Sequence, residues 1–263
     1  MGVSKMRDLY GKHKYIIIKI LIVLLVLFLW YVFTLNQTSH QRLVYPSLTA
    51  LINVIGENYG SIMNYSLITW YRIVFGLLIG SLIGFFFGIV MTWSKLIETI
   101  MDPFIEIIRP IPPIALTPFF ILWFGLGDLG QLVLVSLGCF MVLIVTTIVS
   151  IKNVSPIYVR AALSLGASTF NIYKTIYIPA VMPSIASAIR VAAATGFGLT
   201  VAAEYLGAQG GLGYLIRNAR VTLNTEIIML AALILGIESL ITDQALRSIF
   251  GKITRWLPRT NET

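Results

Sequence analysis

Long apolar runs constrain this chain more than any other feature of its sequence. A helix needs roughly 20 mainly apolar residues to cross a bilayer, and the run from Ile16 to Leu35 reaches that length. Only 11% of the 263 residues are charged, whereas soluble domains carry about 25%. Most of the chain therefore cannot face water, and we expect an all-α polytopic protein embedded in a lipid bilayer.

Polar segments divide the apolar sequence into six predicted transmembrane helices. The predicted spans are residues 15–35, 67–92, 102–125, 130–151, 183–207 and 226–248. We expect the first span to be retained, because it is longer than the apolar core of a signal peptide and lacks a small-residue cleavage site. Residues 46–65 are predicted to form an outer connection that contains one short amphipathic helix.

Glycines and prolines distinguish two of the spans. In the second span, Gly76, Gly80, Gly84 and Gly88 recur every four residues. They share one helix face, which lets a neighbouring helix approach closely.

The third span is interrupted by four prolines between residues 110 and 118, and prolines remove helix hydrogen bonds. Because a broken helix survives in lipid only where protein or water covers the freed groups, this span is expected to line a cavity or pathway.

Basic residues set the predicted orientation. Six spans place both termini on one side, and the side richer in Lys and Arg faces the cytoplasm. The side of the termini carries Lys5, Arg7, Lys12, Lys14, Lys95, Lys152, Arg160, Lys174, Lys252, Arg255 and Arg259, and the other side carries Arg42, Arg217 and Arg220. Both termini and residues 152–178 are therefore predicted to be cytoplasmic, and the connections at 125–130 and 208–225 to face outward.

No arrangement typical of a catalytic, nucleotide or metal site is present in the sequence. The Gly-x-x-x-x-Gly-Lys-Ser/Thr phosphate loop is missing, so we do not expect this chain to hydrolyse ATP or to hold a cofactor. His13 and His40 stand alone, so no metal site is expected, and Cys139 has no second cysteine for a disulfide. The net charge of +8 comes from bases at the ends of apolar runs, so nucleic acid is not an expected partner.

The most specific stretch lies in the predicted cytoplasmic segment. It reads Arg160-Ala161-Ala162-Leu163-Ser164-Leu165-Gly166 and, after nine further residues, Ile176-Tyr177-Ile178-Pro179. This pattern predicts a short helix, a break at the glycine and an amphipathic segment. Phe170, Tyr173 and Tyr177 recur at helical spacing, as in an interfacial helix. The residues alone leave two interpretations open, a surface helix and a dock for a soluble partner.

This spacing resembles the EAA signature of the permease subunits of binding-protein-dependent ABC importers. The Glu of that signature is Arg160 here, and the Leu before its proline is Ile178. The resemblance extends from about Ser61 to Arg247 and implies the type I ABC importer transmembrane fold with six helices. The implied division is 1–60 (N-terminus, first helix and outer connection), 61–247 (importer domain) and 248–263 (basic cytoplasmic tail).

The resemblance also implies the partners of the chain. In this family the loop at 152–179 docks in a cleft of a separate ATPase subunit, which binds the ATP. The implied coupling residues are Arg160, Ala161, Ala162, Gly166, Ala167, Ile176 and Pro179. The other implied partners are a solute-binding protein outside a prokaryotic cell membrane and a second, identical permease copy.

Other stretches are similar to one branch of this family. Residues 109–115 read Arg-Pro-Ile-Pro-Pro-Ile-Ala, and residues 121–127 read Ile-Leu-Trp-Phe-Gly-Leu-Gly. They resemble the branch that imports taurine, alkanesulfonates, nitrate or bicarbonate, as do Ala202-Ala203-Glu204 and residues 211–216. With Arg160 in place of the Glu, the stretch Arg160-Ala161-Ala162 is most similar to the one in taurine permeases. The resemblance implies a small anionic solute and leaves a pyrimidine vitamin precursor or riboflavin as the alternative.

Five charged residues fall inside predicted spans: Arg72, Glu106, Arg109, Arg190 and Glu204. Charge inside a bilayer is costly, so these residues should face the bundle interior and find partners. We predict one contact between Arg72 and Glu204, and a second among Glu106, Arg109 and Arg190. Two roles stay open, namely ion pairs that orient the helices or, for Arg109 above all, attraction of an anion by the guanidinium fork.

The glycines of the outward connection at 208–225 predict a tight turn. The resemblance implies an outer gate at Gly211 and Gly213, or a surface that meets the binding protein, and a plain connecting turn is an equal alternative. Glu238, in the last span, has no partner that the sequence identifies.

Two other classes of protein fit a polytopic chain, a stand-alone secondary transporter and a membrane scaffold. Secondary transporters often show corresponding broken segments in two inverted halves. Only the third span of this chain is visibly broken, which disfavours that class. A scaffold or a secondary carrier would purify without an ATPase.

Overall fold

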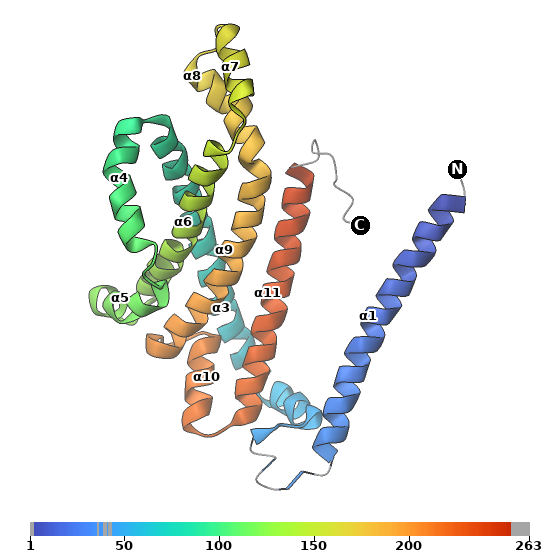
Figure 1. The fold of residues 1–263 in the computed structure, drawn as a ribbon. Coiled ribbons are helices and arrows are strands. Elements are labelled where there is room, and N and C mark those ends of the chain that lie inside the picture. Colours follow the sequence, from blue (N-terminus) through green and yellow to red (C-terminus); the bar gives the residue numbers. More distant parts are fainter. Residues whose placement is uncertain (1–2, 36, 39–40, 42–43, 254–263) are drawn as a thin grey trace. The chain divides into compact units, whose positions relative to one another are not determined.

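The computed structural model describes residues 3–35, 37–38, 41 and 44–253, with the backbone alone for residues 3–16 and 253. The helices are α1 (Val3–Leu35), α3 (Leu48–Trp93), α4 (Lys95–Ile108), α5 (Thr117–Phe124), α6 (Asp128–Lys152), α7 (Pro156–Ser164), α8 (Thr169–Ile172), α9 (Ile178–Gly207), α10 (Leu212–Val221) and α11 (Thr225–Ile253) (Figure 1). A 3-10 turn, η1 (Pro113–Leu116), precedes α5, and a π turn, η2 (Tyr173–Tyr177), precedes α9. No strand occurs in the described ranges, so the all-α prediction is confirmed.

The chain divides into two compact units. Unit 1 comprises residues 1–59 and 219–230, and unit 2 comprises residues 60–218 and 231–263. Every coupling, ion-pair and gate residue predicted above belongs to unit 2. Some bases used to predict orientation lie outside the described side chains, namely Lys5, Arg7, Lys12, Lys14, Arg42, Arg255 and Arg259. The same is true of most of the predicted tail.

The number of membrane-crossing helices agrees with the prediction. Among the described residues, five helices are long and apolar enough to cross a membrane, and a sixth span results if the bent pair formed by α4 and residues 113–124 counts as one. The two parts of that pair meet at 84°. The break falls where the sequence places Pro110, Pro112 and Pro113, so the prediction of an interrupted third span is confirmed.

The predicted connection at residues 46–65 is wrong, because α3 begins at Leu48 and continues without a break to Trp93. The Ser47 hydroxyl accepts a hydrogen bond from the Ala50 N–H at 3.2 Å, which caps the first turn. No proline follows Pro46 until Pro103, so nothing removes a helix hydrogen bond within this stretch. The polar residues of 56–66 lie on a helix rather than in a connection.

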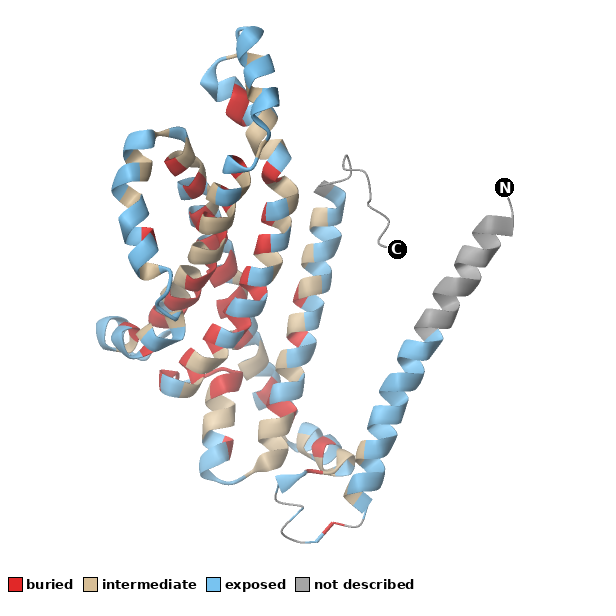
Figure 2. Ribbon diagram, in the orientation of Figure 1, coloured by how far each residue is buried: buried red, intermediate tan, exposed pale blue. Residues whose placement is uncertain are grey.

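Helix α6 is the centre of unit 2, and buried positions concentrate along α6 and α9 (Figure 2). The glycine face of α3 packs directly on α6. A methyl group added at Gly76, Gly84 or Gly88 would lie 2.6 Å from an atom of α6. This confirms that the four-residue glycine repeat permits close helix approach.

Helix α9 packs on another side of α6, also through small residues. Leu199 occupies the space beside Gly138, and the Cys139 thiol lies 3.5 Å from the Ala192 carbonyl oxygen, to which it donates. Cys139 is fully buried. It is therefore a small core residue at the α6–α9 contact.

We expect Gly80→Leu to destabilise the protein by about 2 kcal/mol or more, as overpacked cores do. The new Cβ would collide with the Ser136 carbonyl oxygen and lie 2.8 Å from the Cys139 Cβ, neither of which can move without separating the helices. Thermal unfolding in detergent measures the loss. Gly60→Leu is the control, since nothing lies within 4 Å of a Cβ there. Equal melting temperatures for the two variants would contradict the packing role.

Candidate functional site

A short helical hairpin, α7 and α8 (Pro156–Ile172), forms one end of unit 2 (Figure 1). Helix α7 ends in a Schellman motif centred on Gly166. The Ala167 N–H donates to the Ala162 carbonyl at 3.0 Å, and the Gly166 N–H donates to the Leu163 carbonyl at 2.9 Å. Gly166 has φ +77°, a left-handed conformation that costs other residues energy. This glycine therefore fixes the turn between α7 and α8.

The α7–α8 hairpin presents large apolar side chains to the outside. The exposed set is Ile157, Tyr158, Leu163, Leu165 and Phe170, of which Leu165 is 89% exposed. Among the predicted coupling residues, Arg160, Ala161 and Gly166 are exposed, and Ala162, Ala167, Ile176 and Pro179 are half-buried. An exposed apolar patch with a charged edge is typical of a protein–protein contact.

Aromatic rings fasten the hairpin to the end of α3. The ring of Tyr173 lies 4.7 Å from that of Trp93, the last residue of α3, and also 4.7 Å from that of Tyr177. Phe170 lies 6.3 Å from Trp93 and is otherwise exposed. The predicted stripe of three aromatics on one interfacial face is therefore split, because the α3 terminus covers Tyr173.

Pro179 of the signature stands at the start of α9, directly after the π turn. The Ile178 N–H donates to the Tyr173 carbonyl, five residues earlier, in place of the usual four. Proline has no N–H and its ring clashes with the carbonyl four residues before it. The wider turn therefore lies directly before Pro179, which cannot take part in the regular helical hydrogen-bond pattern.

The second feature of unit 2 is a buried charge network around Arg72. Its guanidinium Nη1 donates to Glu204 Oε1 at 2.7 Å and to the Gly210 carbonyl at 2.8 Å. Nε and Nη2 donate to Asp128 Oδ1 at 3.0 and 2.5 Å. The Thr69 hydroxyl donates to Glu204 at 2.9 Å. We call these five residues the Arg72 network, in which Arg72 is 3% and Glu204 0% exposed.

The backbone after α9 closes over the Glu204 carboxylate. The Gly213 N–H donates to Glu204 Oε2 at 2.9 Å, and the Leu212 N–H donates to the Thr69 hydroxyl at 2.8 Å. Gly211 has φ +104°, and a Cβ there would collide with the carboxylate. A Cβ at Gly213 would collide with the Val201 carbonyl oxygen. Both glycines are therefore required by close approach of the backbone to a buried charge.

The predicted contact between Arg72 and Glu204 is present, while Asp128 and Thr69 were missed. Two features of the sequence could have indicated that Thr69 and Asp128 lie near Arg72. Thr69 precedes Arg72 by three residues and so shares its helix face. Asp128 is the first residue of α6, where an acidic side chain is favoured by the helix dipole.

The second predicted grouping is wrong. Arg190 pairs with Asp243 on α11, at 2.6 Å from Nε and 3.1 Å from Nη2. Glu106 and Arg109 are exposed. The buried residue of α4 is Ile105, which packs against Met91 and Ile144. Similar depth in the bilayer suggested the grouping, but depth does not determine which helices face one another. Glu238 also has a partner, since the Ser66 hydroxyl donates to it.

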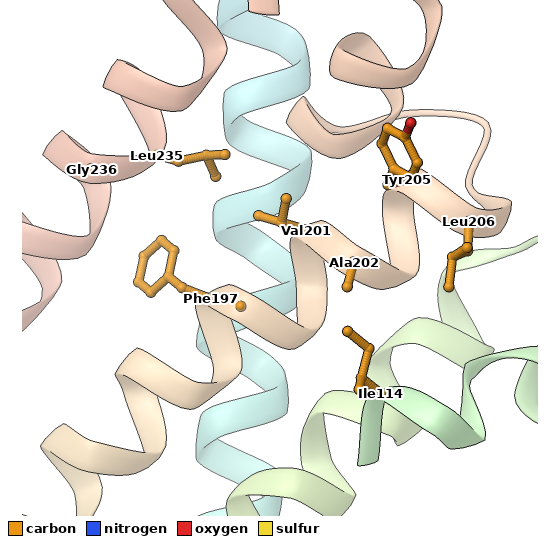
Figure 3. Close-up of a pocket in the computed structure, with 9 residues that line it drawn as sticks. Ile114, Phe197, Val201, Ala202, Tyr205, Leu206, Leu235 and Gly236 are labelled. Carbon is orange, nitrogen blue, oxygen red and sulfur yellow. The ribbon is translucent and has the colours of Figure 1, made fainter. Parts of the chain in front are cut away.

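Two cavities flank η1. One, of about 320 Å³, is lined by Arg109, Pro113, Thr146 and Thr195 together with apolar residues of α4 and α6. The other, of about 600 Å³, is lined by Ile114 and by apolar residues of α9 and α11 (Figure 3). The interrupted span therefore borders open space, as predicted from its prolines.

Known proteins are similar to this chain in sequence. The chain is 31% identical to a putative ABC transporter permease protein of Methanocaldococcus jannaschii, over 92% of this chain and 93% of that protein. It is 31% identical to the taurine transport system permease protein TauC of Escherichia coli, over 70% and 67% of the two chains. It is 29% identical to a putative aliphatic sulfonates transport permease protein, SsuC, of Bacillus subtilis, over 75% of this chain and 71% of that protein.

Solved structures share the fold. A chain of an amino acid ABC transporter superposes with a TM-score of 0.60 at 16% identity, covering 77% of this chain and 97% of that one. Residues 73–253 match the family described as "Binding-protein-dependent transport system inner membrane component". This match includes the hairpin and three members of the Arg72 network (Asp128, Glu204 and Gly210), while Thr69 and Arg72 lie just before it. The chain belongs to that family of ABC importer permeases.

Proposed function

We propose that this ABC importer permease moves a small anionic solute across the membrane and is driven by a separate ATPase that docks on the α7–α8 hairpin. The observation that carries the proposal is the hairpin itself. It exposes five large apolar side chains beside Arg160. An apolar surface of this kind on a permease that lacks a phosphate loop is suited to a protein that supplies ATP hydrolysis.

The proposed orientation places the hairpin and both termini in the cytoplasm. The basic residues on that side outnumber those on the other, which supports this direction. The connection from Ala208 to Thr225 then faces outward, toward a solute-binding protein. We also propose that two identical copies line one pathway, and that closure of the ATPases moves the hairpins and reverses the side to which the pathway opens.

The proposed solute class is an oxyanion such as a sulfonate. TauC and SsuC, whose names refer to taurine and aliphatic sulfonates, are about equally similar to this chain. Nitrate and bicarbonate belong to the same proposed class, and a vitamin precursor is the alternative. The guanidinium of Arg109 lines a cavity and has no carboxylate within ion-pair distance among the described residues, which favours an anion.

We propose that the Arg72 network, with Gly211 and Gly213, holds the outer connection closed. The carboxylate of Glu204 accepts hydrogen bonds from α3 and from the backbone after α9. Opening of the pathway at the outer end must break at least one of these hydrogen bonds to Glu204. The network therefore defines one closed arrangement of the outer end.

Gly166→Val should uncouple ATP hydrolysis from transport. A β-branched residue at φ +77° is strained by about 1–2 kcal/mol, so the hairpin adopts another turn although no neighbouring atom obstructs the side chain. We expect uptake into proteoliposomes to fall about tenfold while basal hydrolysis by the co-purified ATPase persists. Gly127→Val is the matched control, since Gly127 has φ −82° and open surroundings. Wild-type uptake by the Gly166 variant would refute the coupling role.

Glu204→Gln should lower stability by about 3 kcal/mol, since removing one partner of a buried pair leaves a buried charge poorly compensated. The double variant Arg72→Gln/Glu204→Gln should recover part of this loss, because neither charge is then left alone. Melting temperatures of the wild type, the single variants Arg72→Gln and Glu204→Gln and the double variant measure the coupling. Glu57→Gln, at an exposed position of α3, is the control. Additive losses in the double variant would contradict a direct pair.

A further inference from the structure

A polar cavity of about 460 Å³ is bordered by the end of α1, the start of α3 and the start of α11. All of its lining residues belong to unit 1. Neither the α7–α8 hairpin nor the Arg72 network contributes to it. The polar residues that line it are Tyr31, Thr34, Gln37, Ser47, Thr49 and Glu226.

Two of these polar side chains lack a partner within the described part of the chain. Gln37 is only 9% exposed, and its amide Nε2 is buried without a hydrogen-bond acceptor. A buried donor that makes no hydrogen bond is destabilising. No cation of the described residues lies within ion-pair distance of the Glu226 carboxylate. The cavity therefore combines an unused N–H donor with an uncompensated negative charge.

The hydroxyl groups of the cavity add hydrogen-bond acceptors. The Ser47 and Thr49 hydroxyls lie 2.9 Å apart and share one hydrogen bond. The Thr34 hydroxyl donates to the Tyr31 carbonyl at 2.9 Å. Each hydroxyl oxygen keeps a lone pair for a further donor. The lining as a whole suits a ligand that carries a cationic N–H group next to an oxyanion.

The cavity lies at the end of an apolar span, where a membrane meets water. The apolar run Ile17–Leu35 of α1 ends at the cavity wall. The Trp30 indole N–H donates to the Pro46 carbonyl at 3.2 Å, and the Phe33 and Tyr45 rings meet edge to face at 5.5 Å. Trp and Tyr are enriched at the level of the lipid headgroups. These contacts hold the cavity at that level.

We propose that this cavity binds the headgroup of a phospholipid that ends in a primary ammonium, of the ethanolamine type. The ammonium donates to the Glu226 carboxylate and to the hydroxyl oxygens, and the Gln37 amide donates to the phosphate. A choline headgroup has no N–H to donate. A serine headgroup adds a carboxylate, which Glu226 repels. The bound lipid joins α1, α3 and α11 within unit 1, a role separate from the proposed import.

Native mass spectrometry of the purified full chain, with equal amounts of phosphatidylethanolamine and phosphatidylcholine in detergent, tests the site. We expect phosphatidylethanolamine to bind about tenfold more strongly. Glu226→Gln should remove this preference, because the amide carries no charge. Glu57→Gln, at an exposed position of α3, should keep it. Melting temperatures in lipid-free detergent establish that both variants are folded.

A second variant tests the cavity by occlusion. Thr49 is exposed on the first turn of α3 and lines the cavity, so Thr49→Trp should fold and obstruct it. The preference for phosphatidylethanolamine should then disappear although Glu226 is intact. Ile52→Trp is the matched control, since Ile52 is 67% exposed on the same helix and does not line the cavity.

Soluble O-phosphoethanolamine distinguishes a lipid from a free amine, because it carries the same ammonium and phosphate without acyl chains. We expect an excess of it to leave phosphatidylethanolamine bound, since acyl chains keep the lipid headgroup at the cavity. Displacement of the lipid by this compound would overturn the lipid assignment. Equal binding of the two lipids to the wild type, or a preference that survives Glu226→Gln or Thr49→Trp, would overturn the site itself.

Discussion

The structure depends on one constraint, which is that hydrocarbon offers no partner for a backbone N–H or carbonyl group. Continuous helices satisfy it by their own hydrogen bonds, as α3, α6 and α11 do. Helix α9 does so except at Pro183, which has no N–H. The longer departure is the turn between α4 and α5, where prolines prevent helical bonding. That turn lies between two cavities. Where the backbone departs from a helix, the fold thus provides space in which water or a solute can complete the missing bonds.

Close helix packing follows from the same setting. Without a strong hydrophobic effect between helices in lipid, association relies on van der Waals contact and hydrogen bonds. Glycines of α3 bring its backbone against α6, and Gly138 of α6 accommodates Leu199 of α9. Polar contacts are added at both ends of unit 2, through the Arg72 network at one end and Arg190 with Asp243 nearer the other. Packing thus joins the helices, and charges fix their register.

Sequence reasoning recovered the features that local rules determine. The apolar runs predicted the six crossings, the glycine repeat predicted the α3–α6 contact, and the four prolines predicted the break. The EAA-like spacing identified the hairpin because its glycine must adopt a left-handed conformation. It did not predict that α3 begins at Leu48, since polar residues in a helix outside the apolar core resemble a connection.

Pairings between distant helices were only partly predictable. Arg72 and Glu204 were matched by depth and opposite charge, and the same reasoning failed for Arg190. Its true partner, Asp243, lies on α11. Which face of a helix meets which neighbour depends on the rotation of each helix about its axis, and that rotation is set by packing of the whole unit. Burial of Tyr173 under Trp93 has the same origin.

One helix contacts both candidate sites. Trp93 at the end of α3 touches Phe170 of the hairpin, and Arg72 on the same helix holds the Arg72 network. Arg72 and Trp93 are 21 residue steps apart, which correspond to about 32 Å of helix, with no proline or other interruption. A stiff helix transmits a rotation about its axis, or a shift along it, almost undiminished over such a length. A torque applied at the hairpin would therefore reach Arg72 mechanically, without a chain of intermediate side-chain rearrangements.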